Sequence, residues 1–210
     1  MPLVKTLHSE EHTTILVWKI TEDYQTLLEQ VSLKETSQTR LFAMKSQLHQ
    51  RAFLSVRMLL KIKGYSDFDL YYDEFGKPHL TDENHISISH SHEFSTIIIS
   101  NHKVGIDIEL QRDKILKIAH KFIHTEVDFL SKSIHEDKVK KLTVIWGVKE
   151  AIFKIRNEVG ISFKDHIQVN EFQLNDQSGK ATLHFQNHSQ VFLFHFVEIE
   201  QFILVHAFQQ

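Results

Sequence analysis

The chain has 210 residues, of which 41% are hydrophobic and 24% charged, and its net charge is −3 with His neutral. This composition is typical of a globular protein with a buried core; it argues against disorder and, without a basic excess, against a nucleic-acid binder. The absence of Cys excludes disulfides and thiol chemistry. The sequence contains no apolar run of about 18 residues, so no membrane-spanning helix is predicted. Because the first residues also lack the apolar stretch of a signal peptide, we expect a cytoplasmic protein.

The sixteen His residues are unusually many for a chain of this length. They are scattered, they form no HExxH pair, and no Cys could share a metal with them. Most of them are therefore interpreted as solvated surface residues. A His-rich metal-binding or interaction protein remains an alternative, which this scatter disfavours.

The first half of the chain predicts one strand, one long helix and a run of strands. Residues 12–20 are rich in β-branched and aromatic residues, as in a strand. Apolar residues recur at helical spacing over 37–63, and Gly64 would end this helix. Short strands are then predicted at 68–72, 85–89, 95–100 and 104–110, with a turn at DEFGKP between the first two.

The second half repeats this order. A helix is predicted from about Glu136 to Glu158, followed by Gly160. Strands are predicted at 166–174, 180–186, 191–199 and 202–208. Each half is thus a long helix, a Gly and a run of antiparallel strands. An internal duplication is a hypothesis that rests on element order alone, and a different strand order in the two halves would contradict it.

The strand VGIDIEL at 104–110 carries the first candidate site. Because side chains alternate along a strand, Ile106 and Ile108 are predicted to face the core, and Asp107 and Glu109 to share the other face. Two neighbouring carboxylates can bind Mg²⁺ through oxygen. An amphipathic strand with its polar face in water is the alternative, and this segment alone favours it.

The helical segment WGVKEAIFK carries the second candidate site. Trp146, Glu150 and Lys154 are four residues apart and share one helix face, with Lys149 at its edge. Glu150 could supply a third carboxylate and Lys154 could neutralise a phosphate. A Glu–Lys pair on a solvated helix beside a buried Trp is the alternative.

Two shorter motifs could contact phosphate. ISISHS ends a strand with Ser89, His90 and Ser91, whose hydroxyl and imidazole groups suit phosphate oxygens. A hydrolase nucleophile is disfavoured because no G-x-S-x-G elbow is present, and a plain turn stays open. FGKP predicts a tight turn that holds Lys77 outward, although it is not a P-loop and could be a simple turn with an exposed Lys.

FGKP, ISISHS, VGIDIE and WGVKEAIFK, in this order from Phe75 to Lys154, resemble the 4'-phosphopantetheinyl transferase superfamily. The pattern is similar to the single-chain, surfactin-synthetase-activating type. This resemblance implies holo-acyl-carrier-protein synthase activity: transfer of the phosphopantetheine arm of coenzyme A to a Ser of an acyl or peptidyl carrier protein, with release of adenosine 3',5'-bisphosphate. Such a reaction serves fatty-acid or secondary-metabolite synthesis.

The resemblance also implies roles for individual residues. Asp107, Glu109 and Glu150 would bind Mg²⁺ beside the pyrophosphate, and Lys154 would contact phosphate. The residues implied to bind coenzyme A, here the co-substrate, are Lys77 near the adenosine, Ser89 and His90 at the nucleotide's phosphates, and Arg51 or Arg57 at the 3'-phosphate, with Lys45 as a third possibility. Lys121 to Glu126 resembles an F-x-x-x-E segment, which makes Glu126 a candidate partner of Lys149 and a candidate proton acceptor, with a metal-bound water as the alternative acceptor.

The resemblance implies an α+β fold of two similar halves related by pseudo-twofold symmetry, each with a long helix packed on a small antiparallel sheet. Residues 1–103 would form the nucleotide-binding side and residues 104–210 the metal-binding side. We expect a monomer that contacts neither nucleic acid nor membrane. Because carrier proteins are acidic, a basic cluster just after the acidic pair could attract them; the alternative is a solvated helix face. Its members are Arg112, Lys114, Lys117, His120 and Lys121. A nucleotide-binding module without catalysis is an alternative that the complete set of carboxylates disfavours.

Overall fold

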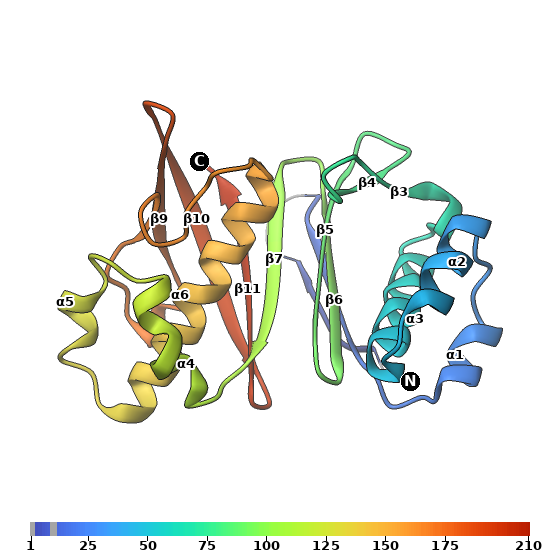
Figure 1. Ribbon diagram of the computed structural model, residues 1–210, viewed down its shortest axis with the longest axis horizontal. Coiled ribbons are helices and arrows are strands. Elements are labelled where there is room, and N and C mark those ends of the chain that lie inside the picture. Colours follow the sequence, from blue (N-terminus) through green and yellow to red (C-terminus); the bar gives the residue numbers. More distant parts are fainter. Residues whose placement is uncertain (1–2, 9–11) are drawn as a thin grey trace. The chain divides into compact units, whose positions relative to one another are not determined.

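The computed structural model describes residues 3–8 and 12–210 of the chain. It divides into two compact units, Met1–His102 and Lys103–Gln210. Both combine helices with antiparallel sheets, so the fold is α+β (Figure 1). Among the described residues, no helix is both long enough and apolar enough to cross a bilayer.

The N-terminal unit is built on a four-stranded antiparallel sheet of order β1-β2-β6-β5, with a separate β3-β4 hairpin. Its elements are β1 Leu3–His8, β2 Thr14–Lys19, α1 Tyr24–Glu29, α2 Glu35–Ala43, α3 Gln47–Ile62, η1 Asp67–Asp69, β3 Leu70–Tyr72, β4 Pro78–Leu80, β5 His85–Ser91 and β6 Phe94–Ser100. The helix α3 is buried without a break from Ala52 to Leu60 and packs on the face of the sheet that carries Leu16 and Trp18. The strand that we predicted at 12–20 is confirmed as β2.

The single helix predicted over 37–63 is wrong, because α2 and α3 are separate helices. Met44 has an extended backbone with ψ 122°, so the chain leaves the helical path there and α3 begins at Gln47. The side-chain amide of Gln50 donates hydrogen bonds to the carbonyl oxygens of Leu41 and Met44, at 3.4 and 3.1 Å. It thereby adds a partner to the Leu41 carbonyl, which also accepts from the Met44 amide at 3.2 Å, and supplies one to the Met44 carbonyl just after the end of α2. Both segments keep apolar residues at helical spacing, so the pattern alone does not show the break.

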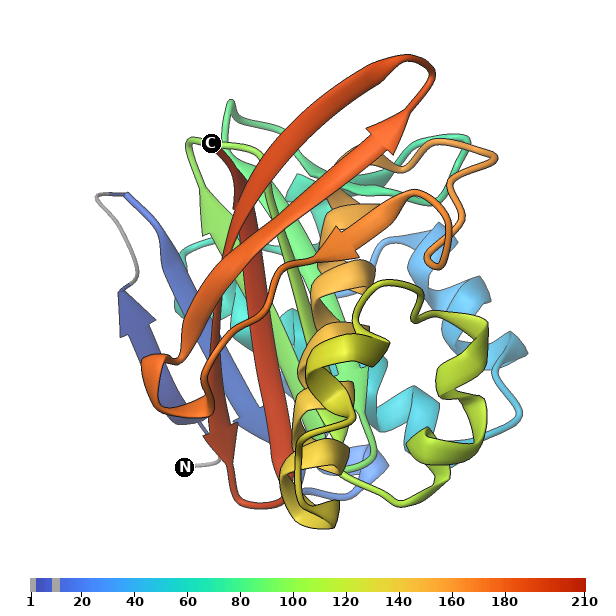
Figure 2. The ribbon, with the colours of Figure 1, turned by 90° about the vertical axis from the view of Figure 1, so that its left-hand side faces the viewer.

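The C-terminal unit is a five-stranded antiparallel sheet of order β7-β11-β10-β9-β8 with one long helix, α6, against it. Its elements are β7 Val104–Leu110, α4 Lys114–Ile118, η2 Ala119–Lys121, α5 Val127–Leu130, α6 His135–Arg156, β8 Ile167–Val169, η3 Leu174–Asp176, β9 Ser178–Phe185, β10 His188–Ile199 and β11 Phe202–Gln209. Figure 2 shows α6 along one face of this sheet, with the short helices α4 and α5 beside it. The strand predicted at 166–174 is shorter than expected: β8 ends at Val169, which pairs with Ala181, and one further bond joins the Asn170 amide to the Lys180 carbonyl oxygen at 3.0 Å.

Two glycines let α6 lie very close to the sheet. A Cβ on Gly105 of β7 would lie 2.0 Å from the carbonyl oxygen of Ala151 in α6. A Cβ on Gly147 of α6 would lie 2.7 Å from the Cγ2 of Val205 in β11. The face of β7 that α6 covers is therefore the face of Gly105 and Asp107. Ile106 and Ile108 are fully buried but point to the opposite face, so the predicted assignment of core and polar faces is corrected.

Three strands of each sheet share an order, although the complete strand orders of the two sheets differ. In each unit the strand before the long helix pairs with the last strand, and the last strand pairs with the one before it, which gives β2-β6-β5 and β7-β11-β10. The N-terminal unit adds β1 beside β2, whereas the C-terminal unit adds β9 and β8 beyond β10. The shared strands thus have the same connectivity around one long helix.

Candidate functional site

Three carboxylates of the C-terminal unit form an acidic cluster where α6 crosses β7. Asp107 is 4% exposed, and one of its oxygens lies 3.7 Å from the position that a Cβ on Gly147 would take. Glu109 lies two residues further along the same face of β7, and Glu150 lies one turn beyond Trp146 on α6. The close approach of helix and strand at the two glycines brings these side chains into one neighbourhood.

Asp107 and Glu109 both act electrostatically on Glu150. The pKa of Glu150 is raised to about 7, first by burial and then by the charge of Asp107; Lys154 lowers it in part, and Glu109 contributes a smaller increase. Glu150 therefore exchanges a proton near neutral pH when no cation is bound. A cluster of this kind favours any cation that offsets its charge.

Lys154 supplies such a charge within the chain. Its ammonium donates to an oxygen of Asp107 at 2.9 Å and to the carbonyl oxygen of Ile106 at 2.8 Å. The side chain is 26% exposed, so it remains accessible from solvent. The predicted stripe of Trp146, Glu150 and Lys154 on α6 thus ends in an ion pair with the strand that it covers.

The residues present fit Mg²⁺ by their chemistry. Mg²⁺ prefers carboxylate oxygens, and it is commonly held by one or two carboxylates together with waters and phosphate oxygens. In the described part of the chain, however, no three His, Asp or Glu side chains are placed as a ready set of metal ligands. Asp107, Glu109 and Glu150 are therefore neighbours of suitable chemistry, with the Lys154 ammonium at Asp107.

Glu126 and Lys149 form a buried ion pair behind this cluster. The ammonium of Lys149 lies 2.7 Å from the Oε1 of Glu126, and the two side chains are 0% and 1% exposed. Burial lowers the pKa of Lys149, and Glu126 counteracts part of this effect. The prediction that Glu126 is the partner of Lys149 is confirmed in this pair.

Two cavities adjoin Trp146 on the side of α6 that faces α4. One of about 160 Å³ is lined by Glu109, Leu110, Arg112, Lys114, Ile115, Ile118 and Trp146. The other, of about 300 Å³, is lined by Ile118, Lys121, Phe122, Trp146 and Phe163. Ile118 and Trp146 line both, so the two cavities lie next to each other beside the acidic cluster. Sequence reasoning missed Phe163, because it lies in a loop without a periodic pattern.

Ser89 and His90 of the N-terminal unit point to opposite faces of β5. Ser89 is 8% exposed, whereas His90 is exposed and its ring lies 5.9 Å from that of His49 in α3. His90 thus shares the face of α3, and Ser89 shares the other face with Ser87 and Ser91. The two side chains do not form one cluster.

The predicted tight turn before Lys77 is present. Gly76 has a φ of +81°, a conformation that favours glycine. The carboxylate of Asp73 accepts hydrogen bonds from the backbone amides of Phe75 and Lys77 and contacts the ring of His79 at 3.0 Å. Hydrogen bonding to His79 and then to Lys77 lowers the pKa of Asp73. Asp73 therefore fixes the backbone on which Lys77 lies.

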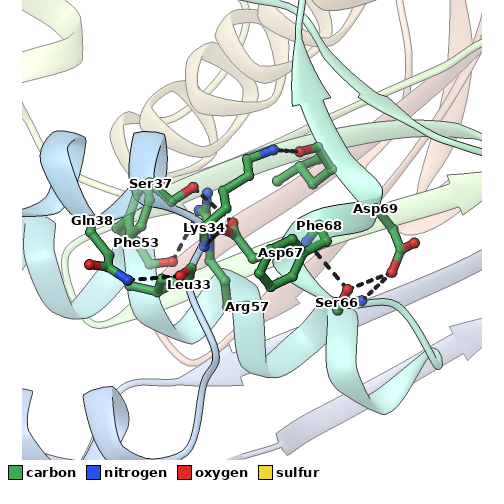
Figure 3. A network of polar contacts seen from close by, with 11 residues as sticks. Leu33, Lys34, Ser37, Gln38, Phe53, Arg57, Ser66, Asp67, Phe68 and Asp69 are labelled. Carbon is green, nitrogen blue, oxygen red and sulfur yellow. Dashed lines mark hydrogen bonds and ion pairs between the residues drawn. The ribbon is translucent and has the colours of Figure 1, made fainter.

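Arg57 lies in the interior of the N-terminal unit (Figure 3). Its guanidinium is 3% exposed, pairs with Asp67 at 2.9 Å and stacks on the ring of Phe53 at 3.5 Å. Asp67 also accepts hydrogen bonds from the Ser37 hydroxyl and the Lys34 amide, each at 3.0 Å. Arg57 thus has a structural role in the interior, and we no longer propose that it contacts the 3'-phosphate.

Arg51 lies less than two turns before Arg57 on α3 and is half-buried. One of its terminal nitrogens donates to the carbonyl oxygen of Ile20 at 3.0 Å. Arg51 also lies near Asp23, whose pKa is lowered mainly by hydrogen bonds from Thr26 and slightly by this arginine. Arg51 is less constrained than Arg57 and remains the better candidate of the two.

Comparison with known proteins matches residues 103–206 to a family model described as the 4'-phosphopantetheinyl transferase superfamily. The chain belongs to this superfamily. The match contains the whole acidic cluster, Lys154 and both cavities, whereas Lys77, Ser89 and His90 lie outside it. A phosphopantetheinyl transferase relative, the 4'-phosphopantetheinyl transferase gsp of Aneurinibacillus migulanus, is 33% identical over 116 residues. The aligned segment covers 55% of this chain and 47% of that relative, so it spans about half of the relative's length.

Proposed function

We propose that the chain transfers the 4'-phosphopantetheine arm of coenzyme A to a Ser of an acyl or peptidyl carrier protein. The observation that supports this most directly is the cluster of Asp107, Glu109 and Glu150 with Lys154, inside the segment that matches the superfamily. A clustered negative charge with one partly exposed ammonium suits a pyrophosphate held through a divalent cation.

In this reaction the carrier Ser hydroxyl attacks the phosphorus that bears the arm. A new P–O bond forms, the P–O bond to the nucleotide breaks, and adenosine 3',5'-bisphosphate leaves with the bond electrons, while the proton of the Ser hydroxyl passes to water. Mg²⁺ would be held by Asp107, Glu109 and Glu150 and would offset the charge of the pyrophosphate oxygens. A cation at Asp107 would replace the Lys154 ammonium there, and Lys154 could then donate to a phosphate oxygen instead.

We propose that residues of the N-terminal unit bind the nucleotide part of coenzyme A. Lys77 on its fixed turn, His90 and Ser89 on β5, and Arg51 on α3 are the candidates. Because Ser89 and His90 lie on opposite faces of β5, they would contact different parts of the nucleotide. Arg57 takes no part in this proposal, because its guanidinium is buried against Asp67.

The larger cavity next to Trp146 is our candidate for the phosphopantetheine arm. The arm leaves the pyrophosphate as a chain of methylene and amide groups, and the two cavities extend from Glu109 past Trp146 to Phe122 and Phe163. Aromatic walls suit such a chain, and Lys121 offers a polar group at the side of the larger cavity.

Transfer can be measured directly by loading a fluorescent coenzyme A onto a panel of apo acyl and peptidyl carrier proteins. We expect Mg²⁺-dependent labelling of at least one carrier, abolished by EDTA and restored by added Mg²⁺. Binding of coenzyme A without transfer to any carrier would contradict the proposal and indicate a nucleotide-binding module instead.

The exposed basic residues of α4 and η2 form the candidate docking surface for an acidic carrier. Arg112, Lys114, Lys117, His120 and Lys121 are all exposed. Charge reversal at Lys114 and Lys117 is expected to raise KM for the carrier more than KM for coenzyme A. Lys180→Glu, at an exposed lysine on β9, is the matched control. An unchanged KM for the carrier in the double reversal would exclude this surface.

We also propose that the two units arose by internal duplication with pseudo-twofold symmetry. The shared order of β2-β6-β5 and β7-β11-β10 supports this. Superposing each isolated sheet and its helix should align these three strands and α3 with α6. An experimental structure in which the strands align in different directions would contradict it.

A further inference from the structure

Lys149 is a charged residue with no access to solvent, and all three of its donors are used. Its ammonium donates to the carbonyl oxygen of Phe122 at 2.7 Å and to that of Phe163 at 2.9 Å. The third partner is Glu126, at 2.7 Å. Lys149 thereby ties the segment after η2 and the loop after α6 to one point on the long helix.

Glu126 completes this connection from the other side. Its Oε2 accepts from the backbone amide of His124 at 2.8 Å, and its Oε1 accepts from the amide of Val169 in β8 at 3.0 Å as well as from Lys149. Both oxygens are therefore occupied, and the side chain is 1% exposed. A carboxylate held in this way has no path to a carrier hydroxyl, which argues against the predicted role of Glu126 as proton acceptor.

The two residues whose carbonyls Lys149 holds are also the walls of the larger cavity. The ring of Phe122 meets that of Trp146 edge-on with centroids 5.1 Å apart, and the ring of Phe163 lies 5.5 Å from Trp146. All three rings line the cavity of about 300 Å³. Neither phenylalanine belongs to a regular helix or strand, so their positions depend on contacts such as those of Lys149.

We propose that Lys149 and Glu126 are positioning residues, which hold Phe122 and Phe163 against Trp146 and so fix the width of the larger cavity. This rests on the proposed function in one respect, that the cavity takes the phosphopantetheine arm. The pair acts through these walls and touches none of the reacting atoms.

Energetics agree with a positioning role. Removing two charges from water is costly, and apolar residues often stabilise a core as well as a buried ion pair does. What an apolar pair lacks is a donor set that reaches two carbonyl oxygens from separate loops. The pair thus holds the two loops in defined positions, which hydrophobic packing alone would not do.

The test compares three variants. The first is a neutral double variant that carries both Lys149→Gln and Glu126→Gln, and the other two are the single variants Glu126→Gln and Lys149→Arg. The double variant keeps polar groups in place without leaving a lone buried charge, so it remains informative if the single variant is unstable. Lys132→Gln, at an exposed lysine, is the control. Each change is made in a Trp18→Phe background, where Trp146 is the remaining tryptophan.

We expect KM for coenzyme A to rise about tenfold in the double variant while kcat stays within about threefold, as for a lost ground-state contact. Trp146 emission should shift to the red and become more accessible to iodide, and Lys149→Arg should restore both readouts in part. A fall in kcat of about a hundredfold in Glu126→Gln with KM and emission unchanged would overturn the proposal, because a general base behaves in that way.

Failure of the two proposals can be told apart. If the parent protein transfers nothing to any carrier, the proposed function fails, and Trp146 emission still tests the positioning role without activity. Unchanged emission and unchanged iodide quenching in the double variant would overturn the positioning role whatever the activity.

Discussion

Two arginines of α3 show how burial decides what a charged residue can do. Arg57 and Arg51 both lie on the helix that the family resemblance associates with the 3'-phosphate. Arg57 is stacked on Phe53 and paired with Asp67, whereas Arg51 is half-buried with one backbone contact. A guanidinium with a buried partner cannot leave it without stranding that partner's charge.

Replacing Arg57 by Met is therefore expected to destabilise the fold by about 3–5 kcal/mol, because Asp67 would remain buried and uncompensated. Urea unfolding would measure this. Arg40→Met is the control, since Arg40 is exposed and stacks on Tyr72 at 4.8 Å; its loss should cost less than about 1 kcal/mol. Arg57→Met with Asp67→Asn removes the lone charge but keeps an oxygen that can accept from Ser37 or Lys34, so it should recover part of the stability and bind coenzyme A normally. A raised KM for coenzyme A in this stable double variant would return Arg57 to the site.

Asp107 is the carboxylate that most directly tests the acidic cluster. Asp107→Asn keeps an oxygen that can accept from Lys154 but removes the charge, so folding should be little affected. We expect transfer to fall by on the order of a hundredfold or more, the scale of losing one charge contact in a preorganised site. The Mg²⁺ concentration for half-maximal rate should rise. Full activity in Asp107→Asn would contradict the metal assignment, and Asp113→Asn, at an exposed acid, is the control.

At the scale of elements, the distance between α6 and the sheet controls the acidic cluster. Gly105 faces a backbone carbonyl oxygen, which cannot move without shifting the helix, whereas Gly147 faces a side-chain methyl of Val205. A side chain is therefore tolerated less well at Gly105 than at Gly147. The position of Glu150 and Lys154 relative to Asp107 depends on the stricter of the two contacts.

Gly105→Ala should therefore displace α6, lower stability by about 3 kcal/mol or more, and reduce transfer in whatever protein stays folded. Gly147→Ala should be milder, because Val205 can adjust and alanine favours a helix by about 1 kcal/mol over glycine. Thermal unfolding and the loading assay, run on both variants, would show this order. Equal effects, or a harmless Gly105→Ala, would contradict the close approach of helix and strand.

At the scale of the whole molecule, pH acts through a buried histidine as well as through the acidic cluster. Burial, and then the neighbouring His195, lowers the pKa of His206 from 6.5 to about 4. The rings of the two histidines stack with centroids 5.3 Å apart. The unfolded chain therefore binds a proton at this position at a higher pH than the folded chain does.

The contribution of neutral His206 to the free energy of unfolding is fully present above about pH 6.5. It is lost as the pH falls toward about 4. At pH 5 the loss is about 2 kcal/mol relative to pH 7.5. Urea unfolding at both pH values should show that His206→Gln loses about 2 kcal/mol less than the parent protein between them. His188→Gln, at an exposed histidine on β10, should lose as much as the parent. Equal losses in parent and His206→Gln would exclude this origin of acid sensitivity.

Much of the fold followed from periodicity. The patterns at 104–110 and near 136–158 predicted β7 and α6 closely, because a buried face repeats every two residues in a strand and about every 3.6 in a helix. The break between α2 and α3 did not follow, since the amide of Gln50 that caps α2 comes from the next helix. The short helices α4 and α5 did not follow either, since they are too short to show a period.

By itself, the sequence determined which chemistry the protein carries: carboxylates on one strand face, a Glu–Lys stripe on a helix, and the family to which this arrangement belongs. The tertiary structure decided which of these groups are available. It buried Arg57 against Asp67, enclosed Glu126 with Lys149, and brought Lys154 to Asp107 across a contact that only Gly105 allows. The physical reason is that residue type and spacing are local properties, whereas burial and charge pairing depend on segments distant in the chain, such as Phe163 and Val169, that meet only when the chain has folded.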